Sequence, residues 1–193
     1  EPSQDESYIR RFLQEARTLS QLNDPNIVNF IDFGQAAEEN VLYLVMELIE
    51  GANLAAVLRN RRLAPALMAE IGIQACSALV EPHHQGVIHR DLKPANLMLS
   101  TRLDGSLHVK LVDFGVANLV HRHTRLTRTG VACGTPKYMA PEQVDADEIE
   151  TGEEDVTPAL DLYALGVIFY RALSGEVVYD AETDVRVLVR TTS

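Results

Sequence analysis

The stretch that decides the fold is Val87–Leu99, which reads VIHRDLKPANLML. It opens and closes with aliphatic residues, and this pattern predicts two short buried strands joined by a polar loop. The loop carries the carboxylate of Asp91, the ammonium group of Lys93 and the side-chain amide of Asn96. A carboxylate that takes a hydroxyl proton, a cation near phosphate oxygens and an amide that ligates Mg²⁺ are the groups that phosphoryl transfer needs. An ion-paired surface turn is the alternative, and this loop alone leaves both interpretations open.

Size and composition exclude several classes of protein. The 193 residues, 46% of them apolar, suffice for one medium domain or two small lobes. No apolar run approaches the roughly 20 residues of a membrane span, and the N-terminal residues lack the features of a signal peptide. We therefore expect a cytoplasmic segment without membrane contact, although a membrane anchor elsewhere in the parent protein stays open. Two distant cysteines, Cys76 and Cys133, indicate a reducing compartment and argue against a thiolate metal site.

The charge pattern argues against nucleic-acid binding. The formal net charge of −11 falls to −4 when the seven acids between residues 145 and 155 are left out. A block of this kind is more typical of a solvated loop than of a functional acidic tail. The chain begins with Glu1 instead of Met and enters patterned sequence almost at once, so we expect a fragment of a longer protein.

Hydrophobic periodicity predicts a chain of mixed helices and strands. Apolar residues at three- and four-residue spacing indicate helices, and β-branched or aromatic runs indicate strands. Pro82 should disturb the last turn of its helix, because proline has no N–H to donate. The sequence after Pro158 is apolar nearly all round, which predicts a buried helix. In chain order, we expect a helix over about 7–22, an antiparallel strand pair over 26–34 and 40–51, helices over 53–60 and about 66–85, a strand over 108–115 and a helix from 158.

Two further motifs follow the opening loop. Asp113 comes 22 residues after Asp91 and opens the triplet DFG at the end of a predicted strand. The glycine permits a backbone conformation that other residues rarely adopt, so Asp113 could turn toward a ligand's phosphates and hold Mg²⁺ together with Asn96. The third motif, GTPKYMAPE, spans residues 134–142. A single DFG triplet is a weak signal, but three such motifs in this order are improbable by chance.

In these three motifs the chain resembles the protein kinases. HRDLKPAN matches the catalytic loop, DFG matches the metal-binding turn, and APE, residues 140–142, matches the end of the activation segment. The resemblance runs from Ser7 to about Gly175 and is greatest to the bacterial eukaryotic-like serine/threonine kinases. It implies an α+β, kinase-like fold of two lobes. Residues 1–48 would form a small lobe lacking its first strands, and residues 49–193 a mainly helical large lobe lacking its last helices.

The resemblance implies roles for the residues of these motifs. It makes Asp91 the catalytic base, Lys93 the cation near the transferred phosphate, and Asn96 and Asp113 the metal ligands. Lys93 and Thr135 favour serine or threonine of a protein over tyrosine or a small molecule as the acceptor. The implied cofactors are ATP and Mg²⁺, with Mn²⁺ as an alternative ion, and the implied partner is a protein substrate.

Other positions follow from the same resemblance, although each has a simpler alternative role. Aliphatic and methionine side chains among them would lie in a core whatever the function, and the threonines could be ordinary loop residues. For the nucleotide, the resemblance places Glu15 opposite the phosphate-binding lysine, Met46 at the gatekeeper position, Glu47 and Ile49 at the hinge that meets adenine, and Met98 against the adenine ring. It places Leu19, Phe30, His89 and Phe114 in an internal hydrophobic spine, Asp161 at an anchor for the catalytic loop, and Glu142 at a structural ion pair. It makes Thr127 and Thr129 phosphorylation sites, whose phosphate Arg90 would bind.

Some features of the family do not occur in this sequence. Kinases of this type carry a glycine-rich loop and a strand lysine ahead of the helix with Glu15, and neither is present. The arginine that usually pairs with Glu142 belongs to later helices, so we expect this carboxylate to lack its partner. An incomplete piece of an active serine/threonine kinase therefore competes with a truncated, non-catalytic binding module or scaffold. We favour the first because the catalytic loop and metal turn are intact, and we expect these 193 residues alone to transfer phosphate poorly.

Overall fold

The computed structural model describes residues 4–36, 41–59, 61–114, 136–143 and 157–178. Its strands form two antiparallel sheets, in the orders β1-β2 and β3-β4-β5. The strands are β1 (Phe30–Ala36), β2 (Val41–Met46), β3 (Ala52–Asn53), β4 (Leu97–Thr101) and β5 (Leu107–Leu111). The helices are α1 (Gln4–Leu19), α2 (Leu54–Val57), α3 (Pro65–His84) and α6 (Ala159–Ser174), with the short 3-10 helices η1 (Pro94–Asn96) and η2 (Pro136–Tyr138).

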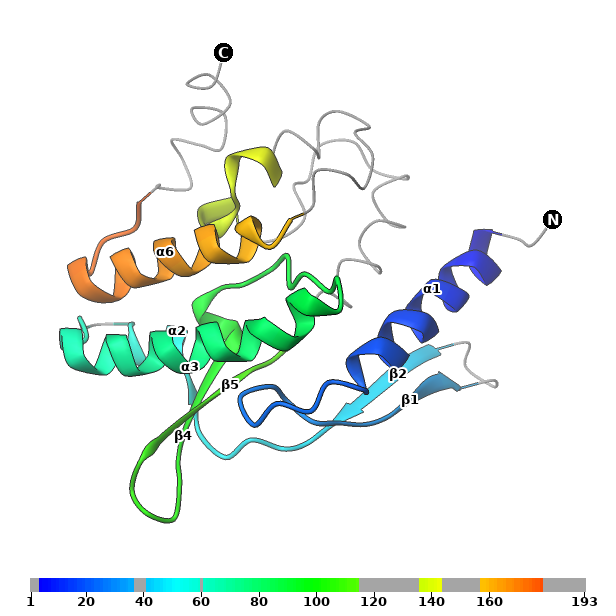
Figure 1. The fold of residues 1–193 in the computed structure, drawn as a ribbon, viewed down its shortest axis with the longest axis horizontal. Coiled ribbons are helices and arrows are strands. Elements are labelled where there is room, and N and C mark those ends of the chain that lie inside the picture. Colours follow the sequence, from blue (N-terminus) through cyan, green and yellow to red (C-terminus); the bar gives the residue numbers. More distant parts are fainter. Residues whose placement is uncertain (1–3, 37–40, 60, 115–135, 144–156, 179–193) are drawn as a thin grey trace.

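The elements form two groups, which Figure 1 shows side by side. One group is α1 with the β1–β2 sheet, and the other is the pair α3 and α6 packed beside the β4–β5 hairpin. The segment between α1 and β1 connects them. The N–H of Leu111 donates to the carbonyl of Asn26 at 2.8 Å, and the N–H of Val28 donates to the carbonyl of Leu111 at 2.9 Å. These bonds fix the approach to β1 against the end of β5.

Local residue choices explain several helix ends. The side chain of Asn53 accepts a hydrogen bond from the N–H of Ala56 at 2.8 Å, and this satisfies one of the free donors at the start of α2. Pro65 occupies the first turn of α3, where its missing N–H removes no helical bond. Gly175 ends α6 with a φ of 80°, a left-handed conformation that glycine adopts at little cost, and its N–H donates to Arg171.

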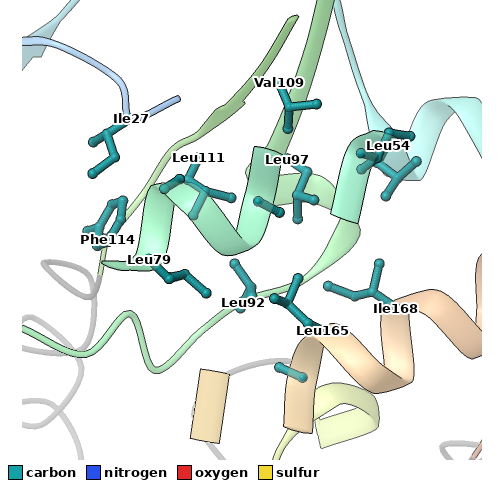
Figure 2. Packing of buried hydrophobic residues seen from close by; sticks show 14 of the residues in the cluster. Ile27, Leu54, Leu79, Leu92, Leu97, Val109, Leu111, Phe114, Leu165 and Ile168 are labelled. Atoms are coloured by element: carbon teal, nitrogen blue, oxygen red, sulfur yellow. The ribbon is translucent and has the colours of Figure 1, made fainter. Parts of the chain in front are cut away.

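One core cluster joins residues from both groups of elements, and Figure 2 shows part of it. Burial of a side chain of leucine size contributes about 1.5–3 kcal/mol to stability, so this cluster is the main source of cohesion. Helix α1 contributes to it through Phe12 and Leu19, which are spaced to share one helix face. The labelled members in Figure 2 are Ile27, Leu54, Leu79, Leu92, Leu97, Val109, Leu111, Phe114, Leu165 and Ile168.

Most predicted elements are confirmed, and three predictions need correction. Val87–His89 forms no strand, because its N–H groups bond elsewhere: that of Val87 donates to the carbonyl of Pro82, and that of His89 to the carboxylate of Asp161. The helix α3 also runs through Pro82 and ends two residues later. The helix α6 is buried on one face only, since Leu162, Tyr170 and Leu173 on its other face are 43–56% exposed.

Candidate functional site

The polar loop before β4 brings its three predicted side chains together. Lys93 Nζ donates to Asp91 Oδ2 at 2.6 Å, a short, charge-assisted hydrogen bond. Asn96 Nδ2 donates to the backbone carbonyl of Asp91 at 2.9 Å. Asn96 is buried within η1, whereas the Asp91 side chain keeps 18% of its surface exposed. The loop therefore presents one accessible carboxylate on a base that the amide holds in place.

Asp113 joins this loop through the residue that precedes it. The N–H of Val112 donates to the carbonyl of Asn96 at 3.0 Å, and Nε2 of His89 donates to the carbonyl of Val112 at 3.0 Å. Asp113 itself is exposed and has a φ of 58°, which lies in the left-handed region. Such a conformation costs a non-glycine residue about 1–3 kcal/mol, and proteins keep it most often at functional sites.

A buried carboxylate holds the backbone just before Asp91. Asp161, 1% exposed, accepts hydrogen bonds from the N–H of His89 at 2.9 Å and the N–H of Arg90 at 3.0 Å. Nε2 of His83, from the last turn of α3, lies 2.8 Å from the same carboxylate. Burial alone would raise the pKa of Asp161, but the His83 hydrogen bond, the charge of His89 and the two backbone N–H groups lower it below its ordinary value.

The His89 ring also contacts the aromatic residue that follows Asp113. The ring centroids of His89 and Phe114 lie 4.7 Å apart, and both side chains are buried. Leu19 and Phe30, the other two predicted members of the spine, belong to the same core cluster as Phe114. The packing of Asp113–Phe114 is therefore continuous with the core that includes α1 and β1.

The segment after β2 is tied to β5 by an ion pair. Lys110 Nζ donates to Glu47 Oε1, and the N–H of Asn29 donates to the same oxygen at 2.7 Å. Burial would raise the pKa of Glu47, but the bonds from Lys110 and Asn29 outweigh this effect and lower it. Met46 and Ile49, on either side of Glu47, are half-buried and pack against the core. The proposed hinge is thus fixed to the strand that leads to Asp113.

A small hollow opens beside Asp91, between the polar loop and residues 138–143. Gln143 borders this hollow, and its Nε2 donates to the carbonyl of Arg90 at 2.7 Å. The lining of the hollow includes Arg90, Asp91, Tyr138, Met139, Gln143 and Asp161.

The remaining predicted residues have mixed positions. Glu15 lies half-buried on α1, and Met98 half-buried on β4. Glu142 is exposed, so water reaches its carboxylate and the penalty expected for a buried, unpaired charge does not apply. The three predicted threonines at positions 127, 129 and 135 lie outside the described residues. Within the described ranges, no helix combines the length and apolar character that a membrane span requires.

Sequence reasoning missed three residues that contact the site. His83, Lys110 and Gln143 each bond a partner at least 53 residues away in sequence. A histidine near a helix end, a lysine on a strand and a glutamine after a motif all look like surface residues in sequence. No local signal separates them from solvated side chains.

A comparison with known families agrees with this geometry. The protein-family model described as "Protein kinase domain" matches residues 1–192 of the chain. The chain belongs to the protein kinase family. Among curated kinases, it is 39% identical over 185 residues to serine/threonine-protein kinase pkn3 of Myxococcus xanthus, and the match covers 94% of this chain and 32% of pkn3. It is 36% identical over 188 residues to PknB of Mycobacterium leprae, over 96% of this chain and 28% of PknB. The chain therefore spans about a third of the length of these curated relatives.

Solved kinase structures show the same fold. Rad53 1-466 in complex with AMP-PNP superposes with a TM-score of 0.70 at 26% identity, over 92% of this chain and 41% of Rad53. The Mycobacterium tuberculosis PknI kinase domain superposes with a TM-score of 0.68 at 24% identity, over 92% and 61% of the two chains. The expected α+β kinase fold is confirmed.

Proposed function

We propose that the protein is an ATP- and Mg²⁺-dependent kinase that phosphorylates serine or threonine in protein substrates. The observation that carries this proposal is the joined set of Asp91, Lys93, Asn96 and Asp113, linked by hydrogen bonds through the loop and Val112. The names of the relatives pkn3 and PknB, both serine/threonine-protein kinases, support the choice of acceptor. A non-catalytic binding module is the alternative, and no described residue favours it over catalysis.

In this proposal Asp91 is the general base. Its carboxylate is partly exposed, so a substrate hydroxyl can approach it and pass a proton to an oxygen. Lys93, already 2.6 Å from Asp91, is placed to bring its remaining N–H donors to the oxygens of the transferred phosphate. General-base help of this kind contributes about 10²- to 10⁴-fold to a rate.

Asn96 and Asp113 are the proposed metal ligands. The side-chain NH₂ of Asn96 donates to the carbonyl of Asp91, and the side-chain oxygen of Asn96 is the acceptor that can ligate a cation. Amide and carboxylate oxygens fit Mg²⁺, which needs only one or two carboxylates beside phosphate oxygens and water. A bound Mg²⁺ would neutralise charge on the ATP phosphates. Mn²⁺ accepts the same oxygen ligands and is the alternative ion.

Adenine is proposed to lie against the segment after β2. The main chain of Glu47 and Ile49 would meet its polar edge, while Met46 and Met98 would contact its ring. The ion pair between Glu47 and Lys110 supports this assignment, because it attaches the segment to β5. We further propose that residues 1–48 and 49–193 act as two lobes around the nucleotide, in the cytoplasm, where ATP is available.

The test is transfer of radiolabelled γ-phosphate from ATP by the full-length protein. Three peptides that differ only in a central serine, threonine or tyrosine serve as acceptors, and the Asp91→Asn variant provides the background. We expect Mg²⁺-dependent transfer to the serine and threonine peptides well above that background. Equal transfer to the tyrosine peptide would reject the proposed acceptor class. Binding of ATP without any transfer would favour the binding module instead.

A further inference from the structure

Arg90, the residue before the proposed base, has a strained backbone. Its φ of 65° lies in the left-handed region, which is unfavourable for a side chain of this size. A residue keeps such a conformation only where its surroundings hold it. One restraint is Asp161, which accepts a hydrogen bond from the Arg90 N–H at 3.0 Å. This hydrogen bond restrains the peptide group between His89 and Arg90. The next peptide group, between Arg90 and Asp91, is restrained by other contacts.

The following peptide group is held at both of its polar atoms. Its carbonyl, that of Arg90, accepts a hydrogen bond from Gln143 Nε2 at 2.7 Å. Its N–H, that of Asp91, donates to the carbonyl of His89 at 2.9 Å. Because a carbonyl oxygen can only accept, the amide of Gln143 must present its NH₂ group here. Rotation of this peptide plane would move Asp91 directly.

Gln143 has a fixed base from which to act. It lies in a helical turn in which its N–H donates to the carbonyl of Ala140 at 3.0 Å. Ala140 is fully buried and packs in a second cluster with Ile88 and Leu160. The turn is therefore attached both to the start of α6 and to the segment before the polar loop.

We propose that Gln143 is a positioning residue that holds the Arg90–Asp91 peptide, and with it the base, in the geometry for proton transfer. The inference rests on the proposed kinase function. It assigns Gln143 and Asp161 complementary tasks, since one holds the carbonyl and the other the N–H of the strained residue. It also means that a shift of residues 140–143 reaches Asp91 through a single hydrogen bond.

The experiment compares the full-length wild-type protein with three variants. Gln143→Glu keeps the shape of the side chain but removes the donor, and Gln143→Met keeps its length without any polar group. Gln21→Met, at an exposed glutamine outside the site, is the matched control. Two quantities are measured well below the lowest melting temperature of the four proteins. They are the steady-state constants for phosphate transfer and the amide hydrogen exchange of the peptide that spans residues 88–92.

We expect both Gln143 variants to lower kcat by about tenfold, with KM for ATP unchanged, because an unpaired carbonyl lets the peptide plane rotate. Exchange at residues 88–92 should become faster in both, whereas Gln21→Met should match wild type. Wild-type kcat in Gln143→Glu would overturn the proposal, since the side chain would then only fill space. Unchanged exchange in both variants would also overturn it. Wild-type transfer no higher than that of Asp91→Asn would reject the kinase function itself, and the exchange data would still decide whether Gln143 holds the loop.

Discussion

Replacement of Asp161 by asparagine keeps the shape of the side chain but turns one of its two acceptor oxygens into a donor. In the wild-type protein, one oxygen accepts from the N–H of His89 and faces His83, and the other accepts from the N–H of Arg90. The best arrangement of the asparagine keeps its oxygen toward His89 and His83. Its NH₂ group then faces the N–H of Arg90, and two donors meet in a buried site.

The size of the effect follows from these contacts. A buried N–H left without an acceptor costs about 1–3 kcal/mol. The two bonds that remain lose the assistance of the negative charge, which is about 1 kcal/mol for each. We expect Asp161→Asn to lower the free energy of unfolding by about 3–5 kcal/mol, a large share of the 5–15 kcal/mol typical of a domain.

The assay is urea unfolding of the full-length protein at neutral pH, followed by circular dichroism. Asp104→Asn is the matched control, because Asp104 is exposed and accepts from Ser106 in a local turn that asparagine can also make. Its effect should be much smaller than that of Asp161→Asn. Equal effects of the two substitutions would refute the argument that the buried bonds of Asp161 hold the loop.

The pH dependence gives a second check on Asp161. Its pKa is lowered in the folded protein, so its contribution to stability is complete above the ordinary value of 3.8 and is lost as the pH falls through the folded-state value. The wild-type protein should therefore lose stability in this acid range more steeply than Asp161→Asn. Parallel losses in the two proteins below pH 3.8 would contradict the lowered pKa.

Two further predictions concern stability. Lys110→Met removes the ion pair with Glu47 and should lower the free energy of unfolding by about 0.5–1 kcal/mol, because the pair is only partly buried. The pKa of Glu47 is lowered in the folded protein, so the stability difference between wild type and Lys110→Met should shrink as the pH falls below 4.5. A stability difference that stays constant with pH would contradict the lowered pKa of Glu47. Gly72→Ala places a Cβ 2.4 Å from the Phe169 ring, whereas Gly166→Ala meets nothing within 4 Å. We expect Gly166→Ala to raise the free energy of unfolding by about 0.5–1 kcal/mol, and we expect the value for Gly72→Ala to be at least about 1 kcal/mol lower than that for Gly166→Ala. Equal melting temperatures of the two variants would contradict this prediction.

The predictable part of the fold depends on local patterns. The helix α1 and the antiparallel pair β1–β2 follow from the spacing and alternation of apolar residues within each segment. Val87–His89 has the composition of a strand, but its N–H groups bond to Pro82 and Asp161 instead of a neighbouring strand. That outcome depends on a helix that begins some 70 residues later, which no local pattern contains.

The candidate site also has a part that the sequence predicts and a part that it does not. Asp91, Lys93 and Asn96 share one short loop, so their proximity follows from the sequence itself. The contacts of His83 and Gln143 with this region require α6 and the turn at 141–143 to be packed first. Such residues become visible only when the tertiary structure brings them to their partners.

The most direct test of the central claim is the rate constant of a single turnover. The full-length protein and its Asp91→Asn variant are each mixed with saturating ATP, Mg²⁺ and a serine peptide, and phosphate transfer is followed over time. We expect the variant to be about 10²- to 10⁴-fold slower, because it lacks the base, while the dissociation constant for ATP stays the same. A variant as fast as the wild-type protein would contradict the assignment of Asp91 as the base, and with it the chemistry proposed for this site.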